Sequence, residues 1–333
     1  MRWGILSTGH ITHSFAKAVV ECKGESLAAV GSRRKEQAEA FAEQFKIPAA
    51  YGSYEALLAD ETIEAVYIGV PHPFHAEWSI KAAQAGKHVL CEKPLAMNVG
   101  EVQDMLDAAR EHKVLLMEAF MYRCHPQTHR ILQIIQKGII GQVKVIRSSF
   151  SFDRDLGLQH RLFNKDLGGG GILDLGCYPV SMSRLLAGAA VGKPYADPDE
   201  VLAAACLGEK SGVDEYASAV LRFPGGILAE LSCGIRVERE SGTLVIYGSE
   251  GRLEVPSPWH CGMTAGETEL FHYRNGSQEP EAIKVRSITS LYASEVETFS
   301  EAVRAGCVSP PAMTHEDSLG NMAVLEKWLK SAK

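Results

Sequence analysis

Short apolar runs alternate with stretches of helical periodicity up to about Met121, and this alternation restricts the fold more than any other feature of the chain. Strands are expected at Trp3–Ser7, Ser26–Ser32, Glu64–Val70, Lys87–Cys91 and Val114–Ala119, and helices at Ile11–Glu21, Phe74–Ala85 and Val99–His112. A further helix is indicated by residues that recur at the spacing of one buried helix face, namely Ala38, Phe41, Ala42 and Phe45. Strands that alternate with helices form right-handed βαβ units, so the sequence predicts an α/β domain on a doubly wound parallel sheet of the Rossmann type.

After Met121 the pattern changes into a series of strands with fewer helices. Strands are expected at Val143–Phe152, Ala203–Leu207, Tyr216–Phe223, Gly226–Cys233, Thr243–Tyr247 and Arg252–Val255, with a hairpin turn at Pro224-Gly225-Gly226. Helices are expected at His129–Lys137, Leu291–Arg304 and His315–Lys330, and the glycine run Gly168–Gly171 opens another toward Leu186. These elements predict an α+β domain with a largely antiparallel open sheet.

The length of 333 residues is more than one core usually holds, so two domains are expected. We predict a dinucleotide-binding domain of residues 1–122 and a domain of residues 123–333 for substrate binding and dimerisation, with the C-terminal helix able to pack back on the first domain.

The composition narrows the class of protein. A net charge of −7 argues against a nucleic-acid or anionic-membrane surface, and no apolar run approaches the roughly 18 residues that span a bilayer. The eight cysteines are spread along the chain without a C-x-x-C pair, which indicates reduced thiols in a cytoplasmic protein. No strong metal signature is present.

The turn after the first expected strand resembles a dinucleotide phosphate loop. In such a loop, small residues let the backbone approach the pyrophosphate, and helix N–H groups point at it. Only Gly9 of the G-x-G-x-x-G pattern is present, because Ser7 replaces the first glycine and Thr12 the third. Cofactor contacts are predicted at Ser7, Thr8, Gly9, His10 and Ile11.

The end of the second strand indicates which nucleotide binds. An NAD site has an acidic residue here for the ribose hydroxyls, whereas an NADP site has cations for the 2′-phosphate. This chain has Ser32, Arg33 and Arg34 before the first carboxylate at Glu36. The alternative is a solvated basic helix start. Because cations oppose the dipole at a helix N-terminus, we predict NADP, with NAD as the second choice.

Cys91-Glu92-Lys93-Pro94-Leu95 places an ammonium group at the end of a buried strand. In an open α/β sheet, ligands bind outside the carboxyl ends of the strands. Placing a lysine near a buried sheet end costs free energy, so Lys93 is the first candidate for a catalytic group. Glu92 and Lys93 are also predicted to contact the cofactor.

Several segments together resemble one enzyme family, that of glucose–fructose oxidoreductase, inositol dehydrogenase and rhizopine catabolism (Gfo/Idh/MocA). The likeness is greatest to its dihydrodiol dehydrogenase and NADP-dependent D-xylose dehydrogenase group. The matching segments, which span nearly the whole chain, are Trp3–Gly9, Val70–His75, Gly86–Pro94, Glu118–Arg123 and Gly168–Tyr178.

The resemblance implies a nicotinamide cofactor, a homodimer and a catalytic lysine at Lys93. Many members have a histidine four residues after the aspartate at Asp174, but this chain has Tyr178 there, as the likened group does. Ser7 in place of glycine is also compatible with that group. The resemblance further suggests a cis Lys93–Pro94 peptide bond.

Three residues are assigned to the chemistry. A tyrosine, with an ordinary pKa of about 10, is a poor base at neutral pH unless a nearby ammonium stabilises its phenolate. Tyr178 is therefore predicted as the general acid/base and Lys93 as its electrostatic activator, although a coupled pair can exchange these roles. Asp174 lies one helical turn before Tyr178 and is predicted to orient a substrate hydroxyl or Lys93. The alternatives are that Tyr178 is an aromatic residue of the core and that Asp174 is a carboxylate that stabilises the start of a helix.

Other polar residues follow the strand ends. Pro71, His72 and His75 are predicted to line the cofactor pocket rather than to bind a metal, because no carboxylate or cysteine ligand accompanies the two histidines. Predicted substrate contacts are Tyr122, Arg123, Arg154 and His160, with Asp155 beside them. An interdomain salt bridge is an equal alternative for Arg123.

The sequence thus predicts an NADP-dependent oxidoreductase that acts on a secondary alcohol of a sugar, cyclitol or dihydrodiol. A nicotinamide-assisted glycosidase and a dinucleotide-sensing regulator without turnover are the alternatives. The partners expected are a small-molecule substrate and a second copy of the chain, with no nucleic acid and no membrane.

Overall fold

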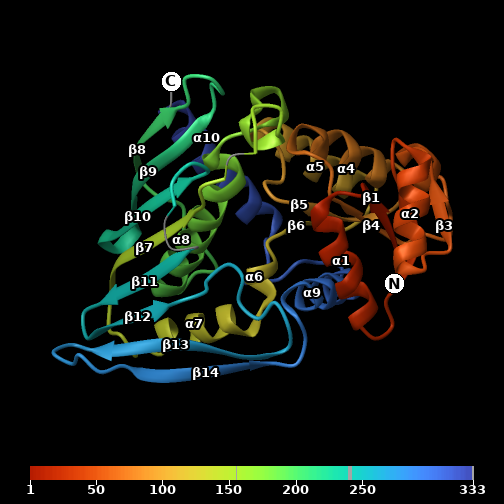
Figure 1. The fold of residues 1–333 in the computed structure, drawn as a ribbon. Coiled ribbons are helices and arrows are strands. Elements are labelled where there is room, and N and C mark those ends of the chain that lie inside the picture. Colours follow the sequence, from red (N-terminus) through yellow and green to blue (C-terminus); the bar gives the residue numbers. More distant parts are fainter. Residues whose placement is uncertain (155, 239–241, 332–333) are drawn as a thin grey trace. The chain divides into compact units, whose positions relative to one another are not determined.

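The computed structural model describes residues 1–154, 156–238 and 242–331 (Figure 1). The chain divides into two compact units. The first unit comprises Met1–Met121 and Thr289–Ser318, and the second comprises Tyr122–Ile288 and Leu319–Lys333. The division predicted from sequence had one boundary, after residue 122. In the structure the chain returns to the first unit near its end.

A six-stranded parallel sheet forms the centre of the first unit, in the order β3-β2-β1-β4-β5-β6. Its strands are β1 (Arg2–Leu6), β2 (Ser26–Gly31), β3 (Ala49–Tyr51), β4 (Ala65–Ile68), β5 (His88–Glu92) and β6 (Leu116–Ala119). All residues of β4 and β6 are buried, as expected for parallel strands that are covered on both faces. This confirms the predicted doubly wound sheet.

Helices cover both faces of this sheet (Figure 1). They are α1 (His10–Glu21), α2 (Lys35–Phe45), α3 (Tyr54–Leu58), the short turn η1 (His72–Phe74), α4 (His75–Gln84), α5 (Val99–Glu111) and α9 (Leu291–Ala305). The ring of Trp3 on β1 lies 5.1 Å from Phe15 on α1 and 5.1 Å from Phe299 on α9. These buried aromatic contacts explain why a helix from the end of the chain belongs to the first unit.

Sequence reasoning missed β3 and α3. A strand of three residues and a helix of five are shorter than the windows in which periodicity can be recognised. Only the serine at Ser53, whose side chain accepts a hydrogen bond from the Ala56 amide, indicated a helix start here.

An eight-stranded sheet forms the second unit, in the order β14-β13-β12-β11-β7-β10-β9-β8. Its strands are β7 (Val143–Ser151), β8 (Glu200–Leu207), β9 (Asp214–Phe223), β10 (Ile227–Gly234), β11 (Thr243–Gly248), β12 (Gly251–Val255), β13 (Gly266–Arg274) and β14 (Glu281–Ser287). Every described pairing is antiparallel except that of β7 with β10. The predicted largely antiparallel sheet is confirmed, and Phe223 pairs with Ile227 across the expected hairpin turn.

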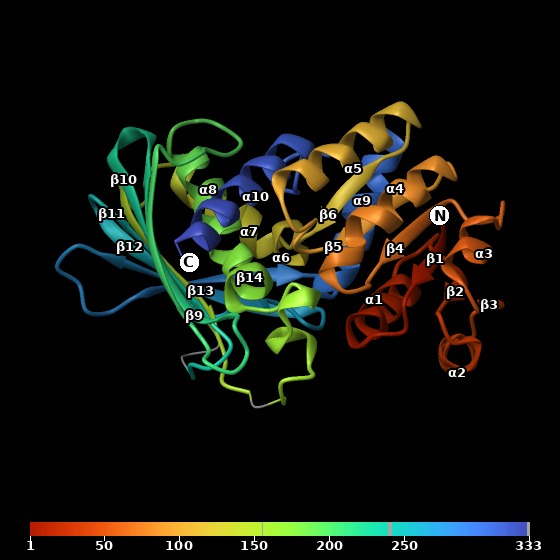
Figure 2. The ribbon, with the colours of Figure 1, turned by 90° about the horizontal axis from the view of Figure 1, so that it is seen from above.

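One face of this sheet packs on helices. Figure 2 shows α7 (Pro126–Gln136) and α8 (Cys177–Ala190) on one side of the sheet, and no described element covers the other side. Exposure alternates along β9 accordingly. The remaining helices are α6 (Met121–Cys124), α10 (His315–Lys330), the π-turn η4 (Ile172–Gly176) and the short turns η2 (Arg161–Phe163), η3 (Lys165–Leu167) and η5 (Pro224–Gly226).

The hairpin of β13 and β14 was not predicted. Its strands carry exposed residues on both faces over much of their length, so the sequence lacks the alternation that marks a half-buried strand. The pairing of the two strands, rather than a buried face, defines this part of the sheet.

Candidate functional site

Helices α1, α2 and α4 of the first unit begin without a side-chain cap. Gly9, which has no side chain, precedes α1, and Arg34 precedes α2 without accepting a hydrogen bond from the helix N-terminus. In contrast, Ser53 caps α3 and Asn98 caps α5. An uncapped helix N-terminus leaves amide donors and a positive dipole end for an anion. The two helices at which sequence predicted cofactor phosphates therefore retain this capacity.

Ser7 adopts the backbone conformation of the glycine that it replaces. Its φ is +108°, a value that L-residues rarely adopt, and its Oγ accepts the Gly9 amide at 3.1 Å. Thr8 and Ile11 are half-buried, whereas Gly9 and His10 are exposed. The loop can therefore approach a pyrophosphate as a glycine-rich loop does, with the serine hydroxyl as an added polar group.

The basic residues after β2 are accessible. Arg33 and Arg34 are exposed, while Ser32 is buried, and its Oγ accepts the Arg34 amide at 3.3 Å. This contact turns the chain so that two guanidinium groups lie at the uncapped start of α2. The first carboxylate, Glu36, lies inside the helix. These residues fit a 2′-phosphate.

Lys93 lies in the turn that follows β5. Lys93 is half-buried, and the Lys93–Pro94 peptide bond is cis, as the family resemblance suggested. The Glu92 side chain is buried, accepts a hydrogen bond from the Tyr67 hydroxyl and accepts the Lys93 amide at 3.2 Å. Glu92 thus supports the turn from the core. The sequence predicted a cofactor contact for this residue but not this supporting role.

The residues after β4 differ in accessibility. Pro71 is half-buried, but His72 is 5% and His75 0% exposed. The ring of His75 contacts the carbonyl oxygens of Val70 and Pro94. His75 therefore lies behind the surface that sequence reasoning expected it to line.

In the second unit, Tyr178 stands in a cluster of aromatic rings. Its ring centroid lies 5.1 Å from Phe150, 5.6 Å from Trp259 and 5.8 Å from Tyr122. The residue is 5% exposed. Packing on three sides fixes the ring, so the hydroxyl has a defined position, as a catalytic group requires.

Asp174 pairs with a residue that sequence reasoning missed. Arg161 donates through Nη1 to Asp174 Oδ1 at 3.1 Å, and the side chain of Asp174 is 6% exposed against 40% for Arg161. Neighbouring His160 accepts the Leu162 amide at 3.3 Å. Burial lowers the pKa of His160, and Arg161 adds to this effect. Arg161 gave no signal because it follows a loop without regular periodicity.

The other predicted substrate contacts lie in different surroundings. Tyr122 and Arg123 are both 0% exposed, and Arg123 donates to the Ser181 carbonyl at 2.9 Å, which ties α6 to α8. Arg154 is exposed, with its guanidinium 5.3 Å from the Phe152 ring. Asp155 lies outside the described residues. The structure thus gives Arg123 a packing contact within its own unit.

Asp214 is a second polar residue that sequence reasoning missed. It is 4% exposed, and its Oδ2 accepts the Ile172 amide at 2.6 Å at the start of the π-turn that carries Asp174. A Cβ on Gly170 would lie 2.1 Å from Asp214 Oδ1, so the glycine run allows this close approach. Gly170 therefore serves close packing at this point.

The described residues show neither a metal-binding cluster nor a membrane-spanning helix. No group of three or more His, Cys, Asp or Glu side chains among them is arranged to hold a metal ion. No helix in the described ranges is both long and apolar enough to cross a membrane.

Comparison with known proteins identifies the family. Residues 1–120 match the model described as "Oxidoreductase family, NAD-binding Rossmann fold", and residues 128–254 match the "GFO/IDH/MocA C-terminal domain". The chain belongs to this family. It is therefore a nicotinamide-dependent oxidoreductase, and the resemblance inferred from its motifs is confirmed.

Relatives match along the whole chain. D-xylose 1-dehydrogenase (NADP(+)) 2 of Haloferax volcanii is 36% identical over 333 residues, which cover 100% of this chain and 98% of that protein. Trans-1,2-dihydrobenzene-1,2-diol dehydrogenase of Danio rerio is 38% identical over 325 residues, covering 96% and 92%. Among solved structures, the 3-ketoreductase KijD10 of Actinomadura kijaniata, in complex with NADP and TDP-benzene, superimposes with a TM-score of 0.87 at 27% identity, covering 100% and 98%.

Proposed function

We propose that this protein is an NADP-dependent dehydrogenase that oxidises a secondary alcohol of a sugar, cyclitol or dihydrodiol, with Lys93 and Tyr178 at the reacting hydroxyl. The observation that carries the proposal is that α1 and α2 both start without a side-chain cap, with Arg33 and Arg34 exposed at the start of α2. The names of the relatives support the substrate class, since they include a xylose dehydrogenase and a dihydrodiol dehydrogenase.

A nicotinamide cofactor held by the Ser7–Ile11 loop and by Arg33 and Arg34 would supply the hydride acceptor for the alcohol carbon. Tyr178 takes the hydroxyl proton, so the alcohol loses a hydride and a proton and becomes a ketone. Lys93 contributes a positive charge that favours the phenolate and stabilises the developing alkoxide. Asp174, held by Arg161 at 3.1 Å, accepts a hydrogen bond from a second substrate hydroxyl. His160 and Arg154 are proposed to contact the remainder of the substrate.

Substitution of the phenol tests this assignment. Tyr178→Phe keeps the ring and its aromatic contacts but removes the proton acceptor, so kcat should fall about 10²- to 10⁴-fold with NADP affinity unchanged. Tyr273→Phe, on β13 where the ring stacks 3.8 Å from the Arg252 guanidinium, is the matched control and should keep wild-type activity. The assay is a panel of aldoses, polyols and dihydrodiols, read by the absorbance of the reduced nicotinamide. NADP binding without turnover on the whole panel would contradict the proposal.

Cofactor preference is tested at α2. Hydrogen bonds between charged groups contribute about 1.5–3 kcal/mol each, so Arg33→Ala and Arg34→Ala should each lower kcat/KM for NADP about 10- to 100-fold and leave that for NAD nearly unchanged. Lys17→Ala, an exposed lysine on α1, controls for the general loss of a positive charge. An equal effect on both nucleotides would refute the proposed 2′-phosphate site.

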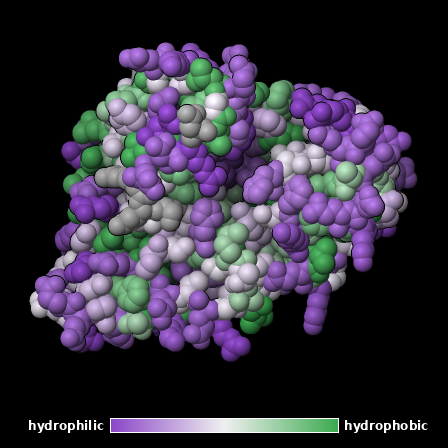
Figure 3. Space-filling view, viewed as in Figure 1, coloured by the Kyte–Doolittle hydropathy of each residue, from purple (hydrophilic) through white to green (hydrophobic). Residues whose placement is uncertain are grey.

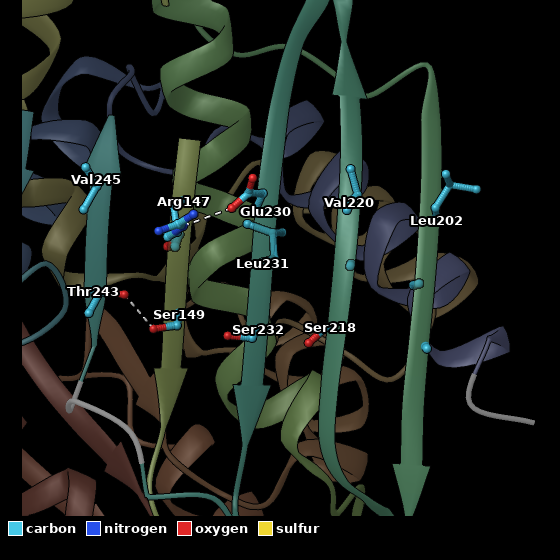
Figure 4. Close-up of a pocket in the computed structure, with 14 residues that line it drawn as sticks. Arg147, Ser149, Leu202, Ser218, Val220, Glu230, Leu231, Ser232, Thr243 and Val245 are labelled. Carbon is cyan, nitrogen blue, oxygen red and sulfur yellow. Dashed lines mark hydrogen bonds and ion pairs between the residues drawn. The ribbon is translucent and has the colours of Figure 1, made fainter. Parts of the chain in front are cut away.

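We further propose a homodimer through the uncovered face of the eight-stranded sheet. This face has a depression of about 960 Å³, and Arg147 and Glu230, which line it, form an ion pair at 3.0 Å. Figure 4 shows the side chains that line this depression. Exposed apolar side chains flank it, with Leu202 58% and Val220 41% exposed, and Figure 3 shows apolar residues along the edge of this unit near β8 and β9. A patch with apolar groups around charges of both signs suits a self-complementary, two-fold interface.

The oligomeric state tests this interface. Val220→Asp should convert a dimer into a monomer in sedimentation velocity, whereas Val20→Asp, at an exposed valine on α1, should not. A wild-type monomer at micromolar concentration would contradict the proposal. We also propose the cytoplasm as the location, in agreement with eight cysteines that form no disulfide within the described ranges.

A further inference from the structure

The ring of His75 joins two neighbouring loops at the carboxyl edge of the six-stranded sheet. Its Nε2 lies 2.8 Å from the carbonyl oxygen of Val70, just after β4, and its Nδ1 lies 2.9 Å from that of Pro94, just after β5. The residue is 0% exposed. Both ring nitrogens therefore contact groups that can only accept a hydrogen bond.

This geometry determines the charge of the ring. A neutral imidazole has one N–H donor, and its other nitrogen carries a lone pair that would face a carbonyl oxygen here. We propose that His75 is a buried imidazolium that donates to both carbonyls, and that it acts as a positioning residue for Lys93 by fixing the turn on which that lysine lies. The second half of this inference rests on the proposed function, because it assigns the chemistry to Lys93.

Three consecutive residues of the turn are held by buried side chains. Glu92 accepts the Lys93 amide at 3.2 Å, His75 contacts the Pro94 carbonyl, and Glu118 accepts the Leu95 amide at 2.9 Å. Glu118 is itself fixed, since its other oxygen accepts the Ser318 hydroxyl at 2.7 Å. The backbone on both sides of Lys93 is thus tied to β5, α4 and β6, which sets the origin of the lysine side chain.

Charged groups of both signs lie on the segments around the ring. Glu92 and Glu118 hold the amides on either side of Pro94, so two carboxyl groups support the segment that His75 contacts. The ring centroid of His72 lies 5.7 Å away. Helix α4 and the described segments packed on it carry further ionisable side chains, namely Tyr67, Glu77, Lys81, His88, Cys91, Lys93, Glu101, Asp104, Asp107, Arg110 and Glu111. A buried charge is retained when hydrogen bonds and opposite charges compensate for the lost water.

Other histidines of the chain give the opposite result by the same reasoning. His88 Nδ1 accepts the Leu115 amide at 2.9 Å, and His125 Nδ1 accepts the Gln127 amide at 3.2 Å. A nitrogen that accepts carries no proton, so both of these rings are neutral. His88 stands at the other end of β5 and provides an internal reference.

Nitrogen NMR of the wild-type protein tests the charge state without any substrate. With ¹⁵N-labelled histidine at pH 7.5, both nitrogens of His75 should have the chemical shift of protonated imidazolium nitrogens, while His88 should show one protonated and one unprotonated nitrogen. Spectra of His75→Gln and His88→Gln assign the signals. An unprotonated nitrogen on His75 would overturn the proposed imidazolium.

Kinetics test the positioning role. A displacement of about 1 Å at a reacting group can cost about 10²-fold, so His75→Phe should lower kcat about 10- to 100-fold with KM for NADP changed less than about 3-fold. His75→Gln, whose amide can donate to one carbonyl, should lie between wild type and His75→Phe and serves if the phenylalanine variant does not fold. His88→Gln should retain the wild-type kcat.

The outcomes separate this inference from the proposed function. A wild-type kcat in His75→Phe would overturn the positioning role. If the wild-type protein oxidised no alcohol with NADP, the proposed function would fail, whereas the NMR spectrum would still decide the charge of His75.

Discussion

The pH dependence of stability should be governed in part by Asp214. Burial raises the pKa of this carboxyl from 3.8 to about 6, although amides of Gly171 and Ile172 that donate to it act in the opposite direction. The folded protein therefore holds the proton more tightly than the unfolded chain does. The contribution of the Asp214 carboxyl to the free energy of unfolding is therefore fully present below pH 3.8 and is lost as the pH rises through about 6.

The magnitude follows from the two pKa values. A difference between 3.8 and about 6 corresponds to about 3 kcal/mol over the whole range, of which about 2 kcal/mol falls between pH 4.5 and 7.5. Asp214→Asn removes the titration and keeps an oxygen that can accept the Ile172 amide. The free energy of unfolding of the wild type, relative to that of Asp214→Asn, should therefore decrease by about 2 kcal/mol between these pH values.

Urea unfolding of both proteins at pH 4.5 and 7.5 measures this difference, because all other titrating groups cancel in the comparison. Asp214→Ala provides a second test. It leaves buried amides without an acceptor, so it should lose about 2–5 kcal/mol relative to wild type at both pH values. If wild type and Asp214→Asn showed parallel pH profiles, Asp214 would have an ordinary pKa and the reasoning from burial would be wrong.

Three further predictions concern packing and buried groups. Burial lowers the pKa of His125 from 6.5 to about 4. The stabilisation that comes from its neutral ring is therefore fully present above pH 6.5 and is lost as the pH falls toward 4. In acid titrations of the free energy of unfolding, His125→Asn should remove about 3 kcal/mol of this pH dependence. Cys206 and Cys307 are exposed and the other six cysteines are buried, and burial raises the pKa of Cys22 and of Cys261 to about 12. A thiol reagent should therefore label two cysteines rapidly in the native protein and eight after denaturation. A Cβ on Gly188 would lie 2.3 Å from the backbone of Tyr195, so Gly188→Ala should lower the free energy of unfolding by about 1–3 kcal/mol, and an unchanged melting temperature would contradict this.

Much of the fold follows from local patterns. The alternation of apolar strands and amphipathic helices before Met121 is sufficient for a doubly wound sheet, because each element must bury one stripe or both faces. The predicted cofactor loop could be located although Ser7 replaces a glycine, because the loop lies between β1 and α1. The short β3 and the polar hairpin of β13 and β14 escaped detection because neither has a periodic buried face.

The sequence alone determined the fold class and the family and indicated candidate residues for the chemistry, since these depend on periodicity and on motifs of adjacent residues. Only the tertiary structure decided which side chains hold those residues in place. Three hydrogen bonds connect positions more than ten residues apart, which no local pattern encodes. They join Arg161 to Asp174, Asp214 to the Ile172 amide, and Glu118 to the Leu95 amide. For the same reason His75, predicted as a cofactor contact, proved to be a buried link between two loops, because its accessibility depends on how β4, β5 and α4 pack.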